Sequence, residues 1–397
     1  MRKGWTYRRI GDVCTVIGGA TPKTEVKEFW GGKNYWITPA DLDGRKYQGA
    51  TPRTITDAAV EKTNLQLLPV GTVLLSSRAP IGKVAITTVP MYCNQGFKNI
   101  ICPDSLLNEF VYWFLFYNKD YLNSLGTGAT FKEISKKTTE SVMLPVPPLA
   151  EQERIVAELD LLQGIINKQK AQLNELDTLA QSIFYDMFGD PVENERRWQS
   201  KPLKELSTLI INGTTPKGGA EVYVPDGIVF FRSQNVWRNR IDYDDVAHID
   251  KATDAKMKKS SLHHNDILIT KTGRINTENS SLGRAALYEG ATGEANINGH
   301  VYLIRLKAGI VSHQFVLKIL TSVAYRDYIR KVCVGGIDKR QINKEHVEEF
   351  PIILPPVSLQ QAFATKIEAL ERQKASINAS IAETQKLFDY TMDKYFG

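Results

Sequence analysis

Two segments have residue types that could support phosphate binding or catalysis, but both lack part of the required pattern. Gly18-Gly19-Ala20-Thr21-Pro22-Lys23-Thr24 is glycine-rich like a phosphate-binding loop. It has no glycine directly before Lys23, and Pro22 removes a backbone N–H that such a loop would use. Glu25-Val26-Lys27 has the Glu-x-Lys order of a nuclease site, yet no Pro-Asp pair lies suitably upstream. We interpret the first segment as a turn and the second as a chance match.

No other residue pattern indicates catalysis. The adjacent pair His263-His264 does not have the spacing of helical metal ligands. A DNA-adenine methyltransferase would need an Asn/Asp-Pro-Pro-aromatic segment and a Gly-rich cofactor turn, and the sequence has neither. The cysteines form no CxxC pair, which predicts reduced, buried thiols at Cys14, Cys93, Cys102 and Cys333. The residues therefore indicate a binding protein with no metal, cofactor or catalytic site of its own.

An internal duplication is the strongest pattern in the chain. Gly19-Ala20-Thr21-Pro22-Lys23 recurs as Gly213-Thr214-Thr215-Pro216-Lys217, 194 positions later. The offset reaches 208 where Pro147-Pro148-Leu149-Ala150-Glu151-Gln152 meets Pro355-Pro356-Val357-Ser358-Leu359-Gln360. Insertions in loops of the second copy explain the change. The sequence thus contains one unit of about 200 residues twice, which predicts a pseudo-symmetric molecule.

Each copy consists of a mixed lobe followed by a long helix. Short β-branched and aromatic runs predict strands in the lobes, and apolar segments near 110–122 and 315–328 predict helices. The expected fold class is α+β, with two pseudo-symmetric globular domains separated by two long helices packed as an antiparallel coiled coil. The expected boundaries are 1–148 and 189–355 for the lobes and 149–188 and 356–397 for the helices.

Apolar residues in the two long segments alternate in steps of four and three, the spacing of a coiled-coil seam. Gln169 is the polar position on the first stripe, and Lys374 interrupts the second. A seam of this length, about 57 Å, exceeds what one small lobe covers, so we favour helix pairing over packing of each helix on its own lobe alone. The seam residues are Ile155, Leu159, Leu162, Ile166, Leu173, Leu176, Ile183, Phe363, Ile367, Leu370, Ile377, Ile381 and Phe388.

The positive charge lies in the lobes. The chain carries 50 Lys and Arg against 44 Asp and Glu, a net charge of +6. The lobes carry +6 and +4, whereas the helical segments carry −4 and 0. Any nucleic-acid contact is therefore expected on the lobes. The absence of a long apolar run or a signal peptide at the N-terminus predicts a cytoplasmic protein without a membrane span.

The order of several segments resembles the specificity (S) subunits of type I restriction-modification systems. These segments are Ser76-Ser77-Arg78-Ala79-Pro80-Ile81-Gly82-Lys83-Val84-Ala85, Asn94-Gln95-Gly96-Phe97, Gly126-Thr127-Gly128-Ala129-Thr130-Phe131-Lys132-Glu133-Ile134-Ser135 and Pro147-Pro148-Leu149-Ala150-Glu151-Gln152-Glu153-Arg154-Ile155. The second half repeats them more loosely, as in Val334-Gly335-Gly336-Ile337-Asp338-Lys339-Arg340-Gln341-Ile342. The resemblance covers the whole chain.

This resemblance implies a function and partners. Each lobe would be a target recognition domain that reads half of a bipartite sequence in double-stranded DNA. The helices would set the spacer and dock methyltransferase (M) subunits. S-adenosylmethionine, ATP and Mg would belong to M and restriction (R) subunits, and this chain would be non-catalytic.

The lobes differ at charged loop positions, which predicts different half-sites and an asymmetric target. Ser77-Arg78 of the first lobe corresponds to Lys271-Thr272-Gly273-Arg274 of the second. Base edges are read mainly by Arg, Lys, Asn and Gln on loops, although each such residue could instead be a solvated charge or a phosphate contact. The candidates are Lys23, Arg78, Lys83, Lys98, Lys217, Arg232, Lys271, Arg274, Arg284, Lys339 and Arg340. The alternative hypothesis is a coiled-coil protein–protein scaffold without DNA recognition.

Overall fold

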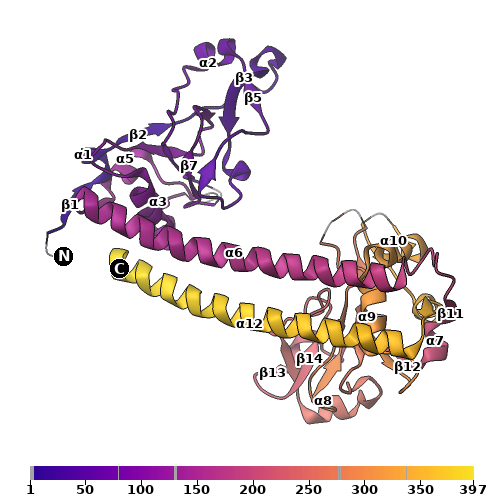
Figure 1. The fold of residues 1–397 in the computed structure, drawn as a ribbon. Coiled ribbons are helices and arrows are strands. Elements are labelled where there is room, and N and C mark those ends of the chain that lie inside the picture. Colours follow the sequence, from indigo (N-terminus) through magenta and orange to yellow (C-terminus); the bar gives the residue numbers. More distant parts are fainter. Residues whose placement is uncertain (1–3, 79, 129–131, 276, 278, 337) are drawn as a thin grey trace. The chain divides into compact units, whose positions relative to one another are not determined.

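The computed structural model describes residues 4–78, 80–128, 132–275, 277, 279–336 and 338–397. The sequence segments 76–85, 126–135 and 334–342 therefore include positions outside the described residues, namely 79, 129–131 and 337. The chain divides into two compact units, Met1–Lys170 with Ala379–Gly397, and Ala171–Asn378. Each unit holds one lobe and part of both long helices, α6 (Leu149–Phe188) and α12 (Val357–Phe396), which are magenta and yellow in Figure 1. The predicted α+β fold class, with two lobes and two long helices, is confirmed.

A five-stranded sheet forms the centre of the first lobe. Its order is β2-β9-β6-β7-β4. Every side chain of β6 and β7 is buried, as expected for aliphatic strands covered on both faces. The strands are β2 (Thr15–Gly18), β4 (Tyr47–Gln48), β6 (Val73–Leu75), β7 (Val84–Thr87) and β9 (Lys98–Ile101). A smaller sheet, β5-β3-β8, and the pair β1-β10 complete the lobe: β1 (Thr6–Arg9), β3 (Trp30–Ile37), β5 (Thr54–Ile55), β8 (Tyr92–Cys93) and β10 (Met143–Val146).

The second lobe repeats four of the five strands of the central sheet. Its central sheet is β12-β20-β16-β18, and the parallel pair β3-β8 recurs as β14-β19, with Phe231 opposite Ile297 where the first lobe has Ile37 opposite Cys93. The pair β11-β23 repeats β1-β10. The predicted duplication is therefore confirmed. The strands are β11 (Gln199–Pro202), β12 (Ser207–Asn212), β13 (Tyr223–Val224), β14 (Ile228–Phe231), β15 (Ala247–Ile249), β16 (Ile267–Thr270), β17 (Thr272–Gly273), β18 (Ala285–Leu287), β19 (Ala295–Ile297), β20 (Val301–Leu306), β21 (Val334–Gly335), β22 (Arg340–Gln341) and β23 (Pro351–Leu354).

The apolar helical segment expected in each lobe is a pair of helices. In the second lobe, α9 (His313–Thr321) ends at Ser322, whose hydroxyl accepts the N–H of Tyr325 and caps α10 (Val323–Val332). In the first lobe the break lies at Asn118, between α3 (Asn108–Tyr117) and α4 (Lys119–Ser124). The remaining α-helices are short: α1 (Ile10–Val13), α2 (Asp57–Thr63), α5 (Lys136–Ser141), α7 (Leu203–Leu206), α8 (Lys251–Ala255) and α11 (Lys344–Glu348). In the part of the chain that the structure describes, four 3-10 helices lie at Lys27–Phe29, Pro39–Asp41, Gly219–Val222 and Lys258–Ser260.

Within the first unit, α6 and α12 pack antiparallel. Arg154 of α6 donates a 2.9 Å hydrogen bond to the Tyr395 hydroxyl of α12, and Gln169 Nε2 lies 2.7 Å from Ser380 Oγ, so numbers rise in one helix as they fall in the other. The seam also packs into the lobe, since a buried cluster joins Leu159 to Phe388 and to lobe residues including Trp113. Helix pairing and packing on the lobe, which the sequence presented as alternatives, occur together.

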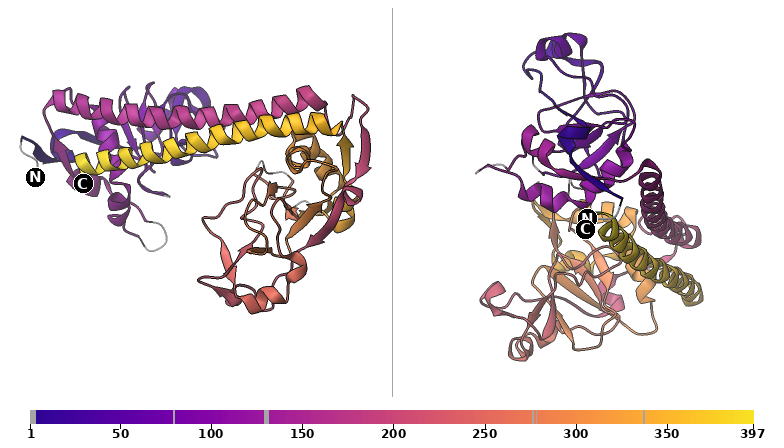
Figure 2. Two further views of the ribbon diagram at one scale, coloured as in Figure 1. Left: turned by 60° about the horizontal axis from the view of Figure 1, so that its bottom comes forward. Right: turned by 90° about the vertical axis from the view of Figure 1, so that its left-hand side faces the viewer.

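The same two helices pack antiparallel in the second unit, and Figure 2 shows them side by side in a second view. Lys374 Nζ of α12 lies 2.5 Å from Asp177 Oδ1 of α6. Burial alone would lower the pKa of Lys374, but hydrogen bonds to Asp177 and Glu371 outweigh it and raise the pKa. The lysine that interrupts the apolar stripe is therefore accommodated by an ion pair.

A buried glutamine fastens the first turn of each long helix to its lobe. Gln152 Oε1 accepts the Leu107 N–H at 2.8 Å, and its Nε2 donates to Pro147 O at 2.9 Å. Gln360 makes the equivalent bonds, from the Ser312 N–H at 3.0 Å and to Pro355 O at 2.9 Å. This shared role explains why the Pro-Pro segments end in glutamine in both copies.

Among the described residues, no helix is long and apolar enough to cross a membrane.

Candidate nucleic-acid interface

The two Thr-Pro-Lys turns occupy equivalent places in the lobes. A side chain on Gly19 would collide with the main chain at β8, and one on Gly213 would collide with the main chain at β19. Each glycine therefore lets its turn approach the parallel strand pair closely. Lys23 and Lys217 in these turns are exposed, and neither forms an ion pair within the described ranges.

Two of the predicted cations of the first lobe are bound to other parts of that lobe. Lys83 Nζ donates to the main-chain oxygens of Pro39 at 3.1 Å and Leu42 at 2.9 Å, and so holds the turn after β3. Lys98 Nζ lies 3.1 Å from Glu133 Oε1 and also donates to Ser77 Oγ at 3.2 Å. The Lys98 side chain is only 12% exposed. These contacts position the loop that carries Arg78.

Arg78 lies on an open cleft of about 390 Å³ in the first lobe. The Trp36 indole and the Arg53 guanidinium also line this cleft, together with Asn94. The Arg53 guanidinium carbon lies 4.9 Å from the centre of the Trp36 ring, a cation–π contact. The cleft thus combines two guanidinium groups and an amide, which are side-chain types that hydrogen-bond base edges, with the buried Trp36 ring supporting Arg53.

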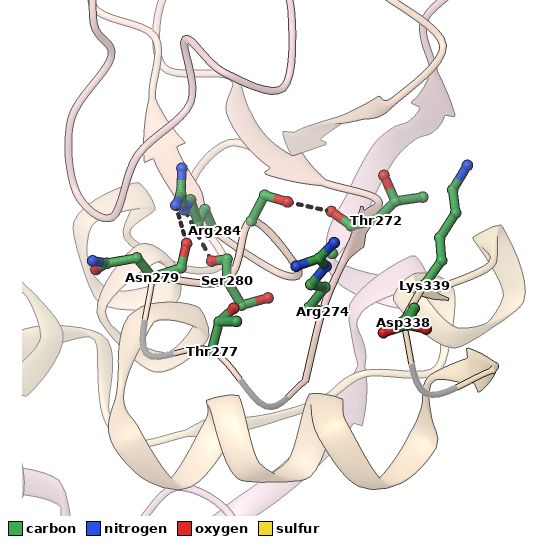
Figure 3. Close-up of a pocket in the computed structure, with 10 residues that line it drawn as sticks. Thr272, Arg274, Thr277, Asn279, Ser280, Arg284, Asp338 and Lys339 are labelled. Atoms are coloured by element: carbon green, nitrogen blue, oxygen red, sulfur yellow. Dashed lines mark hydrogen bonds between the residues drawn. The ribbon is translucent and has the colours of Figure 1, made fainter. Parts of the chain in front are cut away.

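The second lobe has an open, polar cavity of about 490 Å³ in the corresponding loop region. Arg274 and Lys339 line it from two different loops, and Figure 3 shows Asp338 beside Lys339. Hydroxyl groups of Thr272, Ser280 and neighbouring residues complete the lining. Cations and hydroxyl groups facing one cavity are suited to phosphate or base-edge acceptors.

Arg284 forms the wall of this cavity as a largely buried residue. It is 7% exposed, and its Nε donates to Ser280 O at 3.0 Å (Figure 3). Its guanidinium carbon lies 3.9 Å from the centre of the Trp237 ring, and Arg240 stacks on the same ring at 5.4 Å. Burial, with a contribution from the charge of Arg240, lowers the pKa of Arg284. Arg240 is exposed and forms no ion pair among the described residues, so it presents an uncompensated charge.

The other predicted cations of the second lobe are partly engaged. Arg232 forms an ion pair with Asp245, with Nη2 3.2 Å from Oδ1. Lys271 Nζ lies 5.8 Å from the centre of the Tyr302 ring. Arg340 Nη1 donates to Cys333 O at 3.3 Å. The structure brings Arg274, Arg284 and Lys339 to one cavity and leaves Arg232 outside it.

Sequence reasoning missed Arg53, Trp237 and Arg240. Arg53 stacks on Trp36, 17 residues earlier, and Arg240 lies beside Arg284, 44 residues later. The sequence signal that could have found the second-lobe pair is an Arg close to a Trp in a loop, as in Trp237-Arg238-Asn239-Arg240. Within the described residues, no group of three or more His, Cys, Asp or Glu side chains could hold a metal ion.

These features define a duplicated two-lobed protein with cationic loop clusters on related scaffolds. The family described as type I restriction modification DNA specificity domain matches residues 2–177 and 195–385. The chain belongs to this family, and recognition of DNA sequence within a type I restriction-modification system is the function of the class.

Individual relatives agree with this assignment. The type I restriction enzyme MjaIX specificity subunit of Methanocaldococcus jannaschii is 30% identical over 99% of this chain and 92% of its own length. The S subunit structure of a type I system from M. genitalium is 13% identical and covers 99% of this chain and 96% of its own, with a TM-score of 0.56. A chain from a structural study of type I system assembly and conformational transition is 17% identical over 100% of this chain and 98% of its own, with a TM-score of 0.58. The two structures support the fold.

Proposed function

We propose that each lobe reads one half of an asymmetric bipartite DNA target, while the paired helices set the spacer and dock methyltransferase subunits. The chain itself acts without catalysis. Methylation with S-adenosylmethionine, and ATP- and Mg-dependent restriction, belong to the M and R subunits that it directs to DNA. The coarser assignment to DNA sequence recognition follows from family membership.

The observation that carries the proposal is that equivalent loops on the two lobes present different cations. β6 leads into Arg78, whereas the equivalent strand β16 leads into Lys271 and Arg274. The supporting β-sheets are alike, so the difference lies in the loops that can reach base edges. Different donors select different bases, which supports two distinct half-sites.

The structure of the helices supports a role as a spacer. Each helix is 40 residues long, which corresponds to about 60 Å at 1.5 Å per residue. Gln152 and Gln360 attach the helix starts rigidly to the lobes. If each continuous helix is fixed to the lobe that reads DNA, the length of the helix sets the distance between the two half-sites.

An exposed apolar surface on the helices of the first unit supports the docking role. The side chains of Leu161 and Ile165 in α6 and of Leu387 and Tyr390 in α12 are exposed, with Leu161 at 65%. We propose that they face one partner, and we call them the docking surface. The Arg154–Tyr395 and Gln169–Ser380 bonds fix the register so that Leu161 and Leu387 lie at the same level along the helices. Exposed apolar groups on a helix pair are typical of contacts with another protein.

The test uses the full chain in complex with its methyltransferase subunits. Mapping methylated adenines in the host genome, with and without this chain, identifies the target. Binding to target and random duplexes at two salt concentrations then measures specificity and phosphate neutralisation. Arg78→Ala should alter recognition of one half-site and Arg274→Ala the other, while Arg45→Ala, which removes an exposed partner of Asp43, should alter neither. A complex that binds all duplexes equally, or none, would support the scaffold alternative.

A further inference from the structure

The cleft of the first lobe contains an arginine whose orientation is fixed before any ligand binds. The Arg53 side chain is exposed, yet its guanidinium stacks on Trp36 and its Nη2 donates to Thr38 Oγ1 at 3.3 Å. The Thr38 hydroxyl in turn donates to Asp41 Oδ2 at 2.7 Å. A planar guanidinium held by one face and one N–H still has other N–H groups to offer.

The main chain around Arg53 is also anchored. Arg53 O accepts the Trp36 N–H at 3.2 Å and the Thr51 hydroxyl at 2.7 Å. Pro39, which also lines the cleft, is held by Lys83, which donates to Pro39 O and Leu42 O. These bonds fix the main chain at Arg53 and at Pro39, which reduces the entropy lost when a ligand binds.

Arg78 faces the same cleft without a carboxylate partner in the described ranges. Glu133 pairs with the main chain of Arg78, but its carboxylate binds Lys98 Nζ at 3.1 Å. The loop is further held by hydrogen bonds from the Ser77 N–H to Gly96 O and from the Ile134 N–H to Ser77 O. The cleft thus presents two guanidinium groups, Arg53 and Arg78, neither of which forms an ion pair with a carboxylate within the described residues.

We infer that Arg53 and Arg78 are specificity-determining residues that read guanine in the half-site of the first lobe. A guanidinium matches the O6 and N7 acceptors of guanine with two parallel N–H donors, and this geometry depends on orientation, which the Trp36 stack and the Thr38 bond supply for Arg53. Lys83 and Lys98 act as positioning residues behind them. The inference rests on the proposed function and adds the base type and the residues that recognise it.

The test combines side-chain and base substitutions in the complex of the full chain with its methyltransferase subunits. Once the target is mapped, each guanine of the first half-site is replaced in turn by 7-deazaguanine, which lacks the N7 acceptor. The wild-type complex should lose about fivefold or more in affinity at each guanine that is read. The affinity of the Arg53→Ala complex and that of the Arg78→Ala complex should each be unaffected by one of these base changes.

Two further variants separate recognition from charge and folding. Arg53→Lys keeps the charge but lacks the planar fork, so it should lose guanine discrimination while the salt dependence of binding stays unchanged. Arg45→Ala on the same lobe should retain the full penalty for 7-deazaguanine, because Arg45 is outside the cleft and paired with Asp43.

The inference is overturned if the 7-deazaguanine penalty is equal in the wild type and both alanine variants, or if Arg53→Lys discriminates as well as the wild type. It is also overturned if the alanine variants weaken all duplexes alike with a smaller salt slope, since Arg53 and Arg78 would then contact phosphates. Failure of the proposed function is distinct, because the wild-type complex would then show no preference for any mapped target over random duplex.

Discussion

Gln169 of α6 donates a hydrogen bond from Nε2 to Oγ of Ser380 in α12 across the helix seam, at 2.7 Å. The other amide atom, Gln169 Oε1, is buried and has no partner within the described residues. A polar pair inside an apolar seam fixes the register of two helices at a cost in stability. This bond therefore selects the alignment of α6 and α12 in the first unit.

Removing one or both members of this pair should have opposite effects. Ser380→Ala removes the partner of the half-buried Gln169 amide and should lower the free energy of unfolding by about 0.5–1.5 kcal/mol. The double variant Gln169→Leu with Ser380→Ala should be neutral or stabilising, because no buried polar group remains. Urea unfolding of the full chain, monitored by helical circular dichroism, measures both. A double variant less stable than Ser380→Ala would contradict this account.

The buried glutamine at the start of α12 should contribute to stability more than its neighbour. Gln360→Ala leaves the Ser312 N–H and Pro355 O without their hydrogen-bond partner. We therefore expect a loss of about 1–3 kcal/mol in the free energy of unfolding. Gln361 is exposed, so Gln361→Ala is the matched control and should change stability by less than about 0.5 kcal/mol. An equal loss of stability for Gln360→Ala and Gln361→Ala would show that the Gln360 hydrogen bonds do not anchor the helix.

Arg240 is expected to contact phosphate rather than a base. Arg240→Ala should weaken binding of the methyltransferase complex to all duplexes and lower the slope of log affinity against log salt by about one. The preference among half-sites should stay the same. Arg330→Ala, which removes an ion pair with Asp327 at 3.0 Å in the same lobe, serves as the control with an unchanged slope. A change in base preference for Arg240→Ala would assign it to base reading instead.

Shortening the helices should shorten the spacer. Deletion of residues 169–175 from α6 and 374–380 from α12 removes one heptad at the same level of each helix, with both members of the Gln169–Ser380 pair. The helices become shorter by about 10.5 Å, which corresponds to about three base pairs. Methylation mapping should recover the same half-sites with a smaller gap. Insertion of one heptad at the same places is the matched control and should enlarge the gap. An unchanged gap in both variants would rule out the helices as the spacer.

Charge on the docking surface should block assembly. Leu161→Glu combined with Leu387→Glu places two carboxylates among exposed apolar groups and should abolish co-purification with methyltransferase subunits. Folding should persist, because both side chains are exposed. Leu67→Glu changes an exposed leucine of the first lobe and should leave assembly intact. Normal assembly of the double variant would place the methyltransferase contact elsewhere.

The duplication, the lobes and the long helices could be predicted because their signals are local. Repeated motifs and four-three spacing are visible without knowledge of tertiary contacts. The seam is less regular than a strict heptad predicts: Phe184 and Phe188 are fully buried, whereas Ile183 and Met187 are half-buried. An α-helix has 3.6 residues per turn, so a seven-residue pattern drifts around a helix of 40 residues.

The candidate site was harder to predict because each cation depends on distant partners. Lys83 and Lys98 were predicted from the same pattern as Arg78, but carbonyl groups at Pro39 and Leu42 bind one and Glu133 binds the other. Burial of Arg284 against Trp237 depends on how two loops fold together. Sequence alone identifies which residues are charged, while tertiary contacts decide which charges stay available.

The glutamine anchors at Gln152 and Gln360 also determine where the molecule can bend. Each binds the first turn of a long helix to a loop of its lobe through hydrogen bonds of a buried side chain. A change in the angle between either helix and the lobe at its start would break these bonds, whereas a bend within a helix would leave them intact. Gly164 of α6 is a suitable point, because its surroundings are open and glycine lowers the cost of local bending.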